Sequence, residues 1–255
     1  MFTKAQKLAS VRIVLVEPAG DRNIGAISRV MKNFGLQQLV LVNPQCDPQS
    51  EEARRAAVHA GEVLAAQQVV PTLKDALQGC VRAIATTARD RERSPLEHPH
   101  TALPWLLETP LEQPSALIFG PECRGLSNQE LNYAQRFVRI PSNPDYSSLN
   151  LAQAVAVCCY ELTQSVDFST GDRPLPLDYA AIDELEGYYQ HLQAVLLTIG
   201  YVYPHTAASR MEKFRQIFNR AHLDKSELSM LRGILTQMQW ALRKSVNSSV
   251  DKSET

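Results

Sequence analysis

Short apolar runs alternate with segments of helical periodicity through the first 165 residues. The apolar runs are rich in β-branched residues and predict strands buried on both faces, at residues 12–17, 39–42, 81–86, 116–120 and 137–140. Between them, apolar positions recur every three or four residues, which predicts helices at residues 23–34, 50–59, 73–78, 102–108 and 149–164. This alternation predicts an α/β fold with a parallel sheet that helices cover on both faces.

Polar residues at the ends of these segments predict where helices begin and end. Asn23 is placed to cap the helix that follows it, and Gly35 is a stop signal after its last apolar position. Ser127 and Glu130 have the spacing of a capping box and predict one more short helix.

The pattern changes after the last of these helices. Residues 166–178 contain Gly, Pro and acidic residues in close succession and are predicted to be a linker. Residues 179–245 contain three segments with apolar positions at helical spacing, so a small all-helical domain is expected there. The last ten residues, 246–255, are polar and are expected to form a flexible tail.

Composition excludes several classes of protein. No apolar run is long enough to cross a membrane, and the first ten residues lack the apolar core of a secretory signal. The five cysteines are an odd set without a C-x-x-C pair, and the six histidines lack metal-ligand spacing. We therefore expect a cytoplasmic protein without disulfides, membrane contact or metal, with Cys158 and Cys159 buried in a helix.

Common nucleotide and hydrolase motifs are absent. The sequence has no G-x-G-x-x-G after a strand, no G-x-x-x-x-G-K-[ST] and no G-x-S-x-G. These absences argue against a nucleotide-dependent dehydrogenase, a P-loop enzyme and an α/β-hydrolase.

Four polar stretches remain that a hydrophobic core does not require. In the first, Arg29 lies about 150° around its predicted helix from the apolar stripe and so points away from the core. In the second, two glycines flank Glu122 where a buried strand ends, and ligands of open α/β sheets bind at that edge. The third gathers four polar residues near the start of a helix, Tyr146, Ser147, Ser148 and Asn150. The fourth is the polar stretch 85–91, which leaves another strand.

Taken together, the four stretches resemble the motifs of one family, the TrmJ-type tRNA 2′-O-methyltransferases of the SPOUT superfamily. The first matches the N-x-G-x-x-x-R element through Asn23, Gly25 and Arg29. The second matches F-G-x-E-x-x-G-L through Phe119, Gly120, Glu122, Gly125 and Leu126. The third matches P-x-Y-S-S-L-N-L-A over residues 144–152, and the fourth matches T-S-A-R-x-R over residues 86–91 with Thr87 in place of Ser. The similarity continues through residues 177–200 and 210–235, so it covers nearly the whole chain.

The resemblance implies a fold and an activity. Residues 1–165 would be a SPOUT catalytic domain with a trefoil knot at its C-terminal end, and residues 179–245 a helical extension that binds RNA and supports a homodimer. The implied reaction transfers a methyl group from S-adenosylmethionine to the ribose 2′-hydroxyl of cytidine or uridine at nucleotide 32 of the tRNA anticodon loop.

The resemblance also assigns site residues. The implied catalytic residues are Arg29, Ser148, Asn23 and Glu122. The implied cofactor-binding residues are Thr86, Thr87, Ala88, Arg89, Phe119, Gly120, Glu122, Gly125, Ile140, Ser147, Ser148, Leu149 and Asn150. The implied RNA contacts are Arg29, Arg89, Arg91, Arg124, Tyr146, Arg210, Lys213, Arg215 and Arg220. Pro121 departs from the family, where arginine is common, and Arg124 is the candidate to replace that contact.

Three alternatives stay open at this point. The same chemistry can act on ribosomal RNA or at another tRNA position, or the chain can be a non-catalytic RNA-binding module of the same fold. The presence of Asn23, Arg29, Glu122, Ser148 and Asn150 together argues against the last of these.

Net charge does not exclude an RNA partner. The formal net charge of −1 is a sum of local charges of opposite sign. Residues 167–186 carry six acidic residues and one arginine, whereas residues 205–244 carry eight Lys or Arg against three acidic residues. The basic segment is therefore a candidate contact for RNA phosphates.

Overall fold

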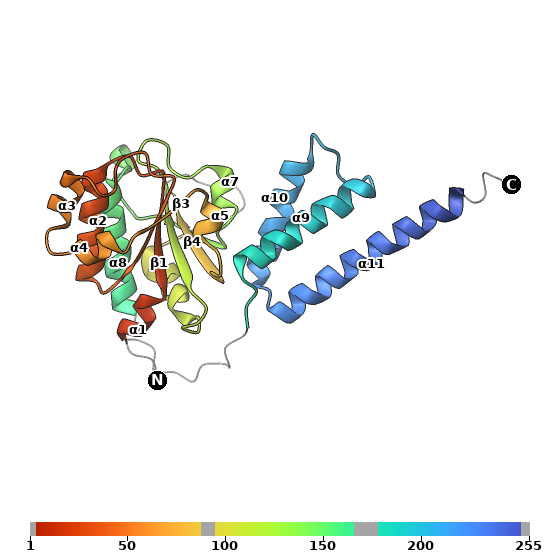
Figure 1. Cartoon of the computed structure of the whole chain (residues 1–255), viewed down its shortest axis with the longest axis horizontal. Coiled ribbons are helices and arrows are strands. Elements are labelled where there is room, and N and C mark those ends of the chain that lie inside the picture. The colour runs from red at the N-terminus through yellow and green to blue at the C-terminus, as the bar shows by residue number, and fades with distance from the viewer. Residues whose placement is uncertain (1–3, 88–94, 166–177, 251–255) are drawn as a thin grey trace. The chain divides into compact units, whose positions relative to one another are not determined.

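The computed structural model describes residues 4–87, 95–165 and 178–250, which belong to two compact units divided at residues 176–177 (Figure 1). Of the predicted linker, residues 166–178, only Asp178 lies within the described residues. None of the described helices is both long and apolar enough to span a membrane.

The first unit is built on a parallel sheet, which confirms the predicted α/β class. Its seven strands follow the order β3-β2-β1-β6-β4-β7-β5, and every described pair is parallel. The strands are β1 Val11–Val16, β2 Gln38–Val42, β3 Gln68–Val70, β4 Arg82–Thr86, β5 Leu96–Glu97, β6 Ser115–Phe119 and β7 Arg136–Val138. Five were predicted from the sequence. The other two do not lie in apolar runs: Gln68 and Val69 of β3 are exposed, and β5 has only two residues.

The order of the strands determines which loops meet. From β1 the chain adds β2 and then β3 on one side, whereas β6 and β4 lie on its other side. All strands run in the same direction, so the loops that follow β1, β4, β6 and β7 leave the sheet at one edge. In parallel sheets, ligands bind at the carboxyl ends of strands near such a reversal of order.

Helices complete the first unit. They are α1 Lys4–Ala9, α2 Asp21–Asn33, α3 Glu51–Ala57, α4 Gly61–Ala65, α5 Leu73–Ala76, α6 Pro99–Ala102, α7 Asn128–Leu131 and α8 Leu151–Ser165, with 3₁₀ turns η1 Leu103–Glu108 and η2 Pro144–Tyr146. The predicted capping box at Ser127 and Glu130 is confirmed at α7. The helix predicted at residues 102–108 is instead a 3₁₀ turn with Pro104 near its start, where proline provides no backbone donor.

Asn23 does not cap α2 as predicted. The extended residue before the helix is Gly20, and its carbonyl accepts hydrogen bonds from the backbone N–H groups of Asn23 and Ile24 at 3.0 and 3.2 Å. The helix therefore begins at Asp21, and Asn23 lies in its first turn with its side chain available for other contacts.

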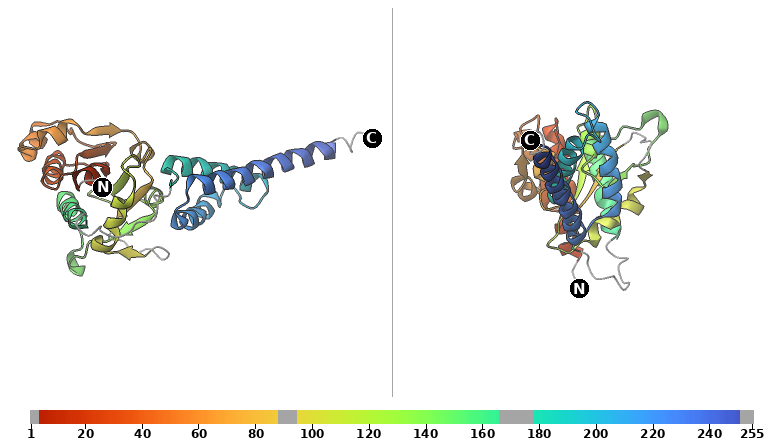
Figure 2. Two further views of the ribbon diagram at one scale, coloured as in Figure 1. Left: turned by 90° about the horizontal axis from the view of Figure 1, so that it is seen from below. Right: turned by 90° about the vertical axis from the view of Figure 1, so that its right-hand side faces the viewer.

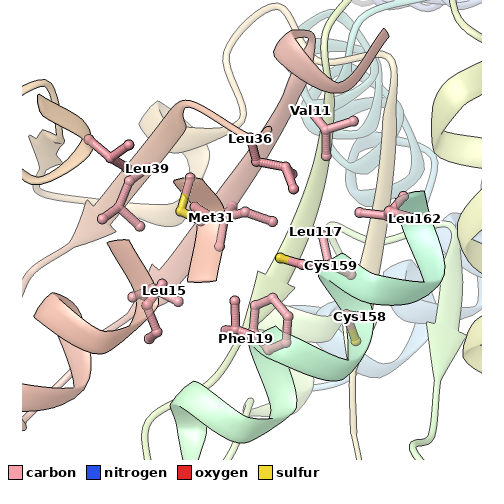
Figure 3. Close-up of a cluster of buried hydrophobic side chains, with 14 of the residues drawn as sticks. Val11, Leu15, Met31, Leu36, Leu39, Leu117, Phe119, Cys158, Cys159 and Leu162 are labelled. Carbon is pink, nitrogen blue, oxygen red and sulfur yellow. The ribbon is translucent and has the colours of Figure 1, made fainter. Parts of the chain in front are cut away.

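The core of the first unit lies where α2 and α8 pack against the sheet (Figure 3). Met31 of α2, Phe119 of β6 and the adjacent Cys158 and Cys159 of α8 are buried there, as the sequence predicted for the two cysteines. Burial raises the pKa of both thiols, that of Cys159 to about 12, so neither ionises at neutral pH. All five cysteines of the chain are free.

Gly25 allows α2 and α3 to approach each other closely. A Cβ atom added at Gly25 would lie 2.0 Å from the carbonyl oxygen of Ala53 in α3. No side chain fits in that space, so the glycine of the N-x-G-x-x-x-R element serves helix packing.

The second unit consists of three helices, α9 Ile182–Thr198, α10 Ala207–Ala221 and α11 Lys225–Val250. Buried residues of the three helices form its core, among them Tyr189, Met211 and Leu228. Figure 2 shows α11 continuing past the ends of α9 and α10. This helix includes residues 246–250, the first five residues of the segment for which the sequence predicts a flexible tail.

Arg215 packs against this core, which disfavours its predicted contact with RNA. Its guanidinium forms an ion pair with the buried Glu186, with 2.8 Å between Nη2 and Oε2, and lies 4.4 Å from the centre of the Tyr189 ring. On a helix of 3.6 residues per turn, Arg215 is about 140° from Arg210, which turns it towards α9. Breaking a buried pair of this kind leaves an unpaired charge, so Arg215 stabilises the unit.

Replacing Gly25 with alanine is expected to lower the free energy of unfolding by about 2 kcal/mol, because the new methyl group must push α3 away from α2. For a unit of this size, the loss corresponds to a fall in Tm of roughly 4–8 °C in thermal unfolding followed by circular dichroism. Gly61→Ala is the matched control, since Gly61 also lies in a helix and a Cβ there meets nothing within 4 Å. Equal Tm values for the two variants would contradict the packing role of Gly25.

Candidate functional site

A cleft opens at the carboxyl edge of the sheet in the first unit. Its volume is about 280 Å³, close to the lower end of the range for small-molecule sites. It is lined by Thr86, Thr87, Phe119, Gly120, Pro121, Glu122, Cys123, Arg124, Gly125, Leu126, Val138, Arg139, Ile140, Ser147, Ser148, Leu149, Leu151 and Ala154. These residues belong to the segments that follow β4, β6 and β7 and to the first turns of α8. The structure thus brings together three of the four polar stretches that the sequence singled out.

The loop after β6 is closed by its two glycines. A Cβ atom on Gly120 would lie 2.4 Å from the backbone nitrogen of Leu126 and 2.6 Å from the carbonyl carbon of Gly125. Gly125 has a φ of +66°, in the left-handed region that favours glycine. The loop therefore folds back on itself, and the backbone of residues 120–126 forms one wall of the cleft.

Arg124 holds this loop in place. Its two terminal nitrogens, Nη1 and Nη2, each donate to a carboxylate oxygen of Glu130 at 2.9 Å, and Nη2 also donates to Glu17 at 2.7 Å. Burial alone would raise the pKa of Glu130, but hydrogen bonds from Arg124 and Ser127 outweigh it and hold that pKa at about 2. Arg124 is thus committed within the chain, which disfavours its predicted contact with RNA and its suggested replacement of the family arginine at the buried Pro121.

A chain of side-chain hydrogen bonds joins three motif residues at the mouth of the cleft. Asn150 Oδ1 accepts from the backbone N–H of Ala152 at 2.9 Å and so caps α8. Asn150 Nδ2 donates to Asn23 Oδ1 at 3.1 Å, and Asn23 Nδ2 donates to Glu122 Oε1 at 3.0 Å. Glu122 Oε2 also accepts from the backbone N–H of Ala19 at 3.2 Å. This chain connects the loops that follow β1, β6 and β7.

The segment after β7 contributes two serines to the lining of the cleft. Ser147, Ser148 and Leu149 line it, and the backbone of Ser147 is fixed by a 3.0 Å hydrogen bond from the Ser142 hydroxyl to its carbonyl. Tyr146, for which the family resemblance implies a contact with RNA, is 79% exposed and is not among the residues that line the cleft. Asn150 also lies outside the lining, where it caps α8.

The segment after β4 supplies two threonines. Thr86 Oγ1 donates to the carbonyl of Ile118 at 3.1 Å. The backbone N–H of Thr87 donates to the carbonyl of Val138 at 2.9 Å. Both therefore sit rigidly between neighbouring strands. Ala88, Arg89 and Arg91, which complete the predicted element, lie outside the described residues.

Arg29 lies apart from the cleft. It is exposed on α2, as predicted, and it is not among the lining residues. Within the parts of the chain that the structure describes, its guanidinium has no hydrogen bond or ion pair. Arg22 lies on nearly the same face of the helix, because seven residues span about two turns.

Three of the predicted RNA contacts lie in the second unit and are exposed on α10. Arg210, Lys213 and Arg220 fall within about 80° of one another around the helix and form one basic face.

Seven lining residues were not among the predicted site residues. They are Pro121, Cys123, Leu126, Val138, Arg139, Leu151 and Ala154. Leu126 and Leu151 belong to the motif matches, whereas the other five are marked in the sequence only by their position at the end of a strand, in the loop after it, or in the first turns of α8. Among residues 4–87, 95–165 and 178–250, no group of three or more His, Cys, Asp or Glu could hold a metal ion.

Comparisons with known proteins show the family. The SpoU rRNA Methylase family matches residues 10–160, and the C-terminal domain of the tRNA methyltransferase TrmJ matches residues 183–249. The tRNA (cytidine/uridine/adenosine-2′-O-)-methyltransferase TrmJ of Pseudomonas aeruginosa is 39% identical over 259 residues, which cover 92% of this chain and 96% of that protein.

Solved structures agree with this assignment. The crystal structure of TrmJ from Z. mobilis superposes with a TM-score of 0.79 at 33% identity and covers 89% of this chain and 98% of that one. The SpoU methyltransferase AviRb from Streptomyces viridochromogenes, in complex with the cofactor AdoMet, has a TM-score of 0.50 at 20% identity over 61% of this chain and 60% of its own, and so shares the fold. The chain therefore belongs to the SpoU methylases of the SPOUT superfamily and, within them, to the TrmJ-type tRNA methyltransferases.

Proposed function

We propose that the protein transfers a methyl group from S-adenosylmethionine to the ribose 2′-oxygen of cytidine or uridine at nucleotide 32 of the tRNA anticodon loop. The observation that carries this proposal is the hydrogen-bond chain from Glu122 through Asn23 to Asn150. It joins three motif elements at the mouth of a cleft that backbone loops enclose. The names of the relatives support tRNA as the substrate, and the match of the C-terminal domain favours tRNA over ribosomal RNA.

The lining of the cleft fits the proposed cofactor. Its apolar walls, which include Leu126, Val138 and Ile140, suit the adenine ring. Polar groups for the ribose and the amino-acid part are available from Thr86, Ser147 and the backbone of the glycine loop. When bound, S-adenosylmethionine supplies an electrophilic methyl group on a sulfonium. The part left to the protein is to position that methyl group against a ribose hydroxyl and to keep water away.

Activation of the hydroxyl requires a route for its proton. We assign to Arg29 the binding of the adjacent phosphate and the orientation of the 2′-hydroxyl. A guanidinium stays protonated in proteins, so Arg29 cannot act as the base. The proton then leaves to a phosphate oxygen or to water, either directly or through Ser148, whose hydroxyl would take it up while passing its own proton on. Glu122 and Asn23 position the loops around this reaction.

We infer a homodimer from the place of Arg29. It lies outside the cleft of its own subunit, so the cleft of the partner subunit is where it would act. The face of α8 next to α2 carries the exposed apolar residues Val157 and Tyr160, and Tyr160 packs edge-to-face on Phe34 with ring centres 6.3 Å apart. An exposed apolar face of this kind is typical of an interface between subunits.

The second unit is proposed to bind the rest of the tRNA. Its exposed basic face, Arg210, Lys213 and Arg220, suits the sugar–phosphate backbone. The trefoil knot, which the family resemblance implies, and a cytoplasmic location, which the sequence predicts, remain predictions.

Mass spectrometry of the methylated RNA tests the proposal. Unmodified tRNA incubated with the protein and isotope-labelled S-adenosylmethionine should gain one label on the ribose of nucleotide 32. The same tRNA with a 2′-deoxyribose at that nucleotide is the control and should gain none. Label on a base, label at another nucleotide, or no label on the unmodified tRNA would contradict the proposal.

Mixed dimers test whether each site is shared between subunits. Arg29→Ala should reduce methyl transfer at least about 100-fold while leaving cofactor affinity nearly intact, because only a contact to the reacting RNA is lost. Arg22→Ala, on the same face of α2, is the control and should keep its activity. Ala154→Trp should be inactive because the indole fills the cleft.

Mixing equal amounts of the two inactive variants gives the decisive result. If Arg29 acts in the cleft of the partner subunit, half of the dimers are mixed and each mixed dimer has one intact site, so about a quarter of the wild-type activity returns. No recovery in mixed dimers, verified by two different tags, would show that Arg29 does not act across the interface.

A further inference from the structure

The connection between α9 and α10, which Figure 1 shows as a loop, contains two exposed tyrosines, Tyr201 and Tyr203. Tyr201 is 58% and Tyr203 is 59% exposed, although large aromatic side chains usually lose most of their contact with water in a folded unit. Exposed aromatic clusters of this kind mark binding surfaces.

This connection is held rigidly. Val202, between the two tyrosines, is buried in the core of the second unit. The carbonyl of Leu196 accepts from the backbone N–H groups of Tyr201 and Val202 at 3.0 and 3.2 Å, and the N–H of Thr206 donates to the carbonyl of Tyr203 at 2.9 Å. Because Val202 points inward, the side chains on both sides of it are directed outward.

Each exposed ring is oriented by one neighbour. Tyr201 packs edge-to-face against Phe214 of α10, with ring centres 6.4 Å apart. Tyr203 lies nearly parallel to the imidazole of His205, at 5.9 Å and an interplanar angle of 14°. The rings are thus preorganised, so a ligand would not have to order them when it binds.

The free charges beside these rings are positive. Arg210 and Lys213 are exposed on α10, within one turn of Phe214, and neither forms an ion pair among the described residues. Glu212 is the only acidic residue between positions 199 and 213. Cations beside exposed aromatic faces match the chemistry of a single-stranded nucleic acid, whose bases stack and whose phosphates are negative.

We propose that Tyr201, Tyr203 and His205, which we call the aromatic platform, stack against unpaired bases of the bound RNA while Arg210 and Lys213 contact the flanking phosphates. This inference rests on the proposed function, because it takes RNA as the ligand. It specifies that unpaired nucleotides are recognised at a second place, outside the cleft. A protein partner is disfavoured because the exposed centre of the surface is two phenol rings and an imidazole beside unpaired cations.

RNA-binding measurements on the full-length chain test the platform. Tyr201→Ala and Tyr203→Ala should each weaken binding of an unmodified tRNA transcript about tenfold in fluorescence anisotropy, within the range for loss of one base–aromatic stack. Tyr203→Phe should bind as the wild type, since it keeps the ring. Met230→Ala is the control, because Met230 is similarly exposed on α11 without an aromatic ring, and it should also bind as the wild type.

Two further readouts separate stacking from a structural role. In steady-state methyl transfer, Tyr203→Ala should raise the KM for tRNA, whereas Met230→Ala should keep the wild-type KM. A tRNA carrying 2-aminopurine at successive unpaired positions should show quenching with the wild type at one or more of them, and this quenching should be lost with Tyr203→Ala.

Three results would overturn the proposal: unchanged tRNA affinity in both alanine variants, an equal loss in Met230→Ala, or a change of oligomeric state in Tyr203→Ala. The last would show that the rings face protein. Failure of the proposed function is distinguishable, because it appears as absence of ribose methylation by the wild type, whereas RNA affinity is measured independently.

Discussion

The cleft depends on a chain of hydrogen bonds whose direction is set at one end. Asn150 Oδ1 caps α8, so its Nδ2 must donate, and Asn23 has to present its oxygen to Asn150. The amide nitrogen of Asn23 then faces Glu122, whose carboxylate accepts from both Asn23 and the backbone of Ala19. No member can be reversed without leaving donors facing each other. Three loops from distant parts of the chain are therefore held in one arrangement, and the walls of the cleft follow from it.

The motif residues divide into those that shape the site and those that remain available for chemistry. Gly25 permits the contact between α2 and α3, Gly120 permits the closure of the loop after β6, and Arg124 ties that loop to Glu17 and Glu130. Arg29 has no such task within its own subunit. An exposed arginine without a described partner, carried on a helix that the glycine contact fixes, is suited to bind a phosphate of the substrate. On α2, Gly25 thus helps to shape the site, whereas Arg29 supplies a positive charge.

The sequence predicts the α/β class well because five of the strands overlap predominantly apolar runs of four or more residues. Strands β3 and β5 do not lie in such runs. The sequence wrongly predicts that Asn23 caps a helix, because its actual partners, Glu122 and Asn150, are 99 and 127 residues away in the chain. The same limit applies to Arg215. Its charge predicts a contact with RNA, whereas in the structure it pairs with Glu186, which is 29 residues away. Strand ends gave the position of the cleft, whereas contacts between side chains distant in the chain required the structure.

A double-mutant cycle on Asn23 and Asn150, read out as affinity for S-adenosylmethionine by calorimetry, tests the central role of the hydrogen-bond chain most directly. Neither residue lines the cleft, so any loss of affinity must come from the loops they hold. Each alanine variant should weaken binding about fivefold, and the double variant should be no weaker than either, which corresponds to a coupling of about 1 kcal/mol. Unchanged affinity in Asn23→Ala, or losses that multiply in the double variant, would contradict the account.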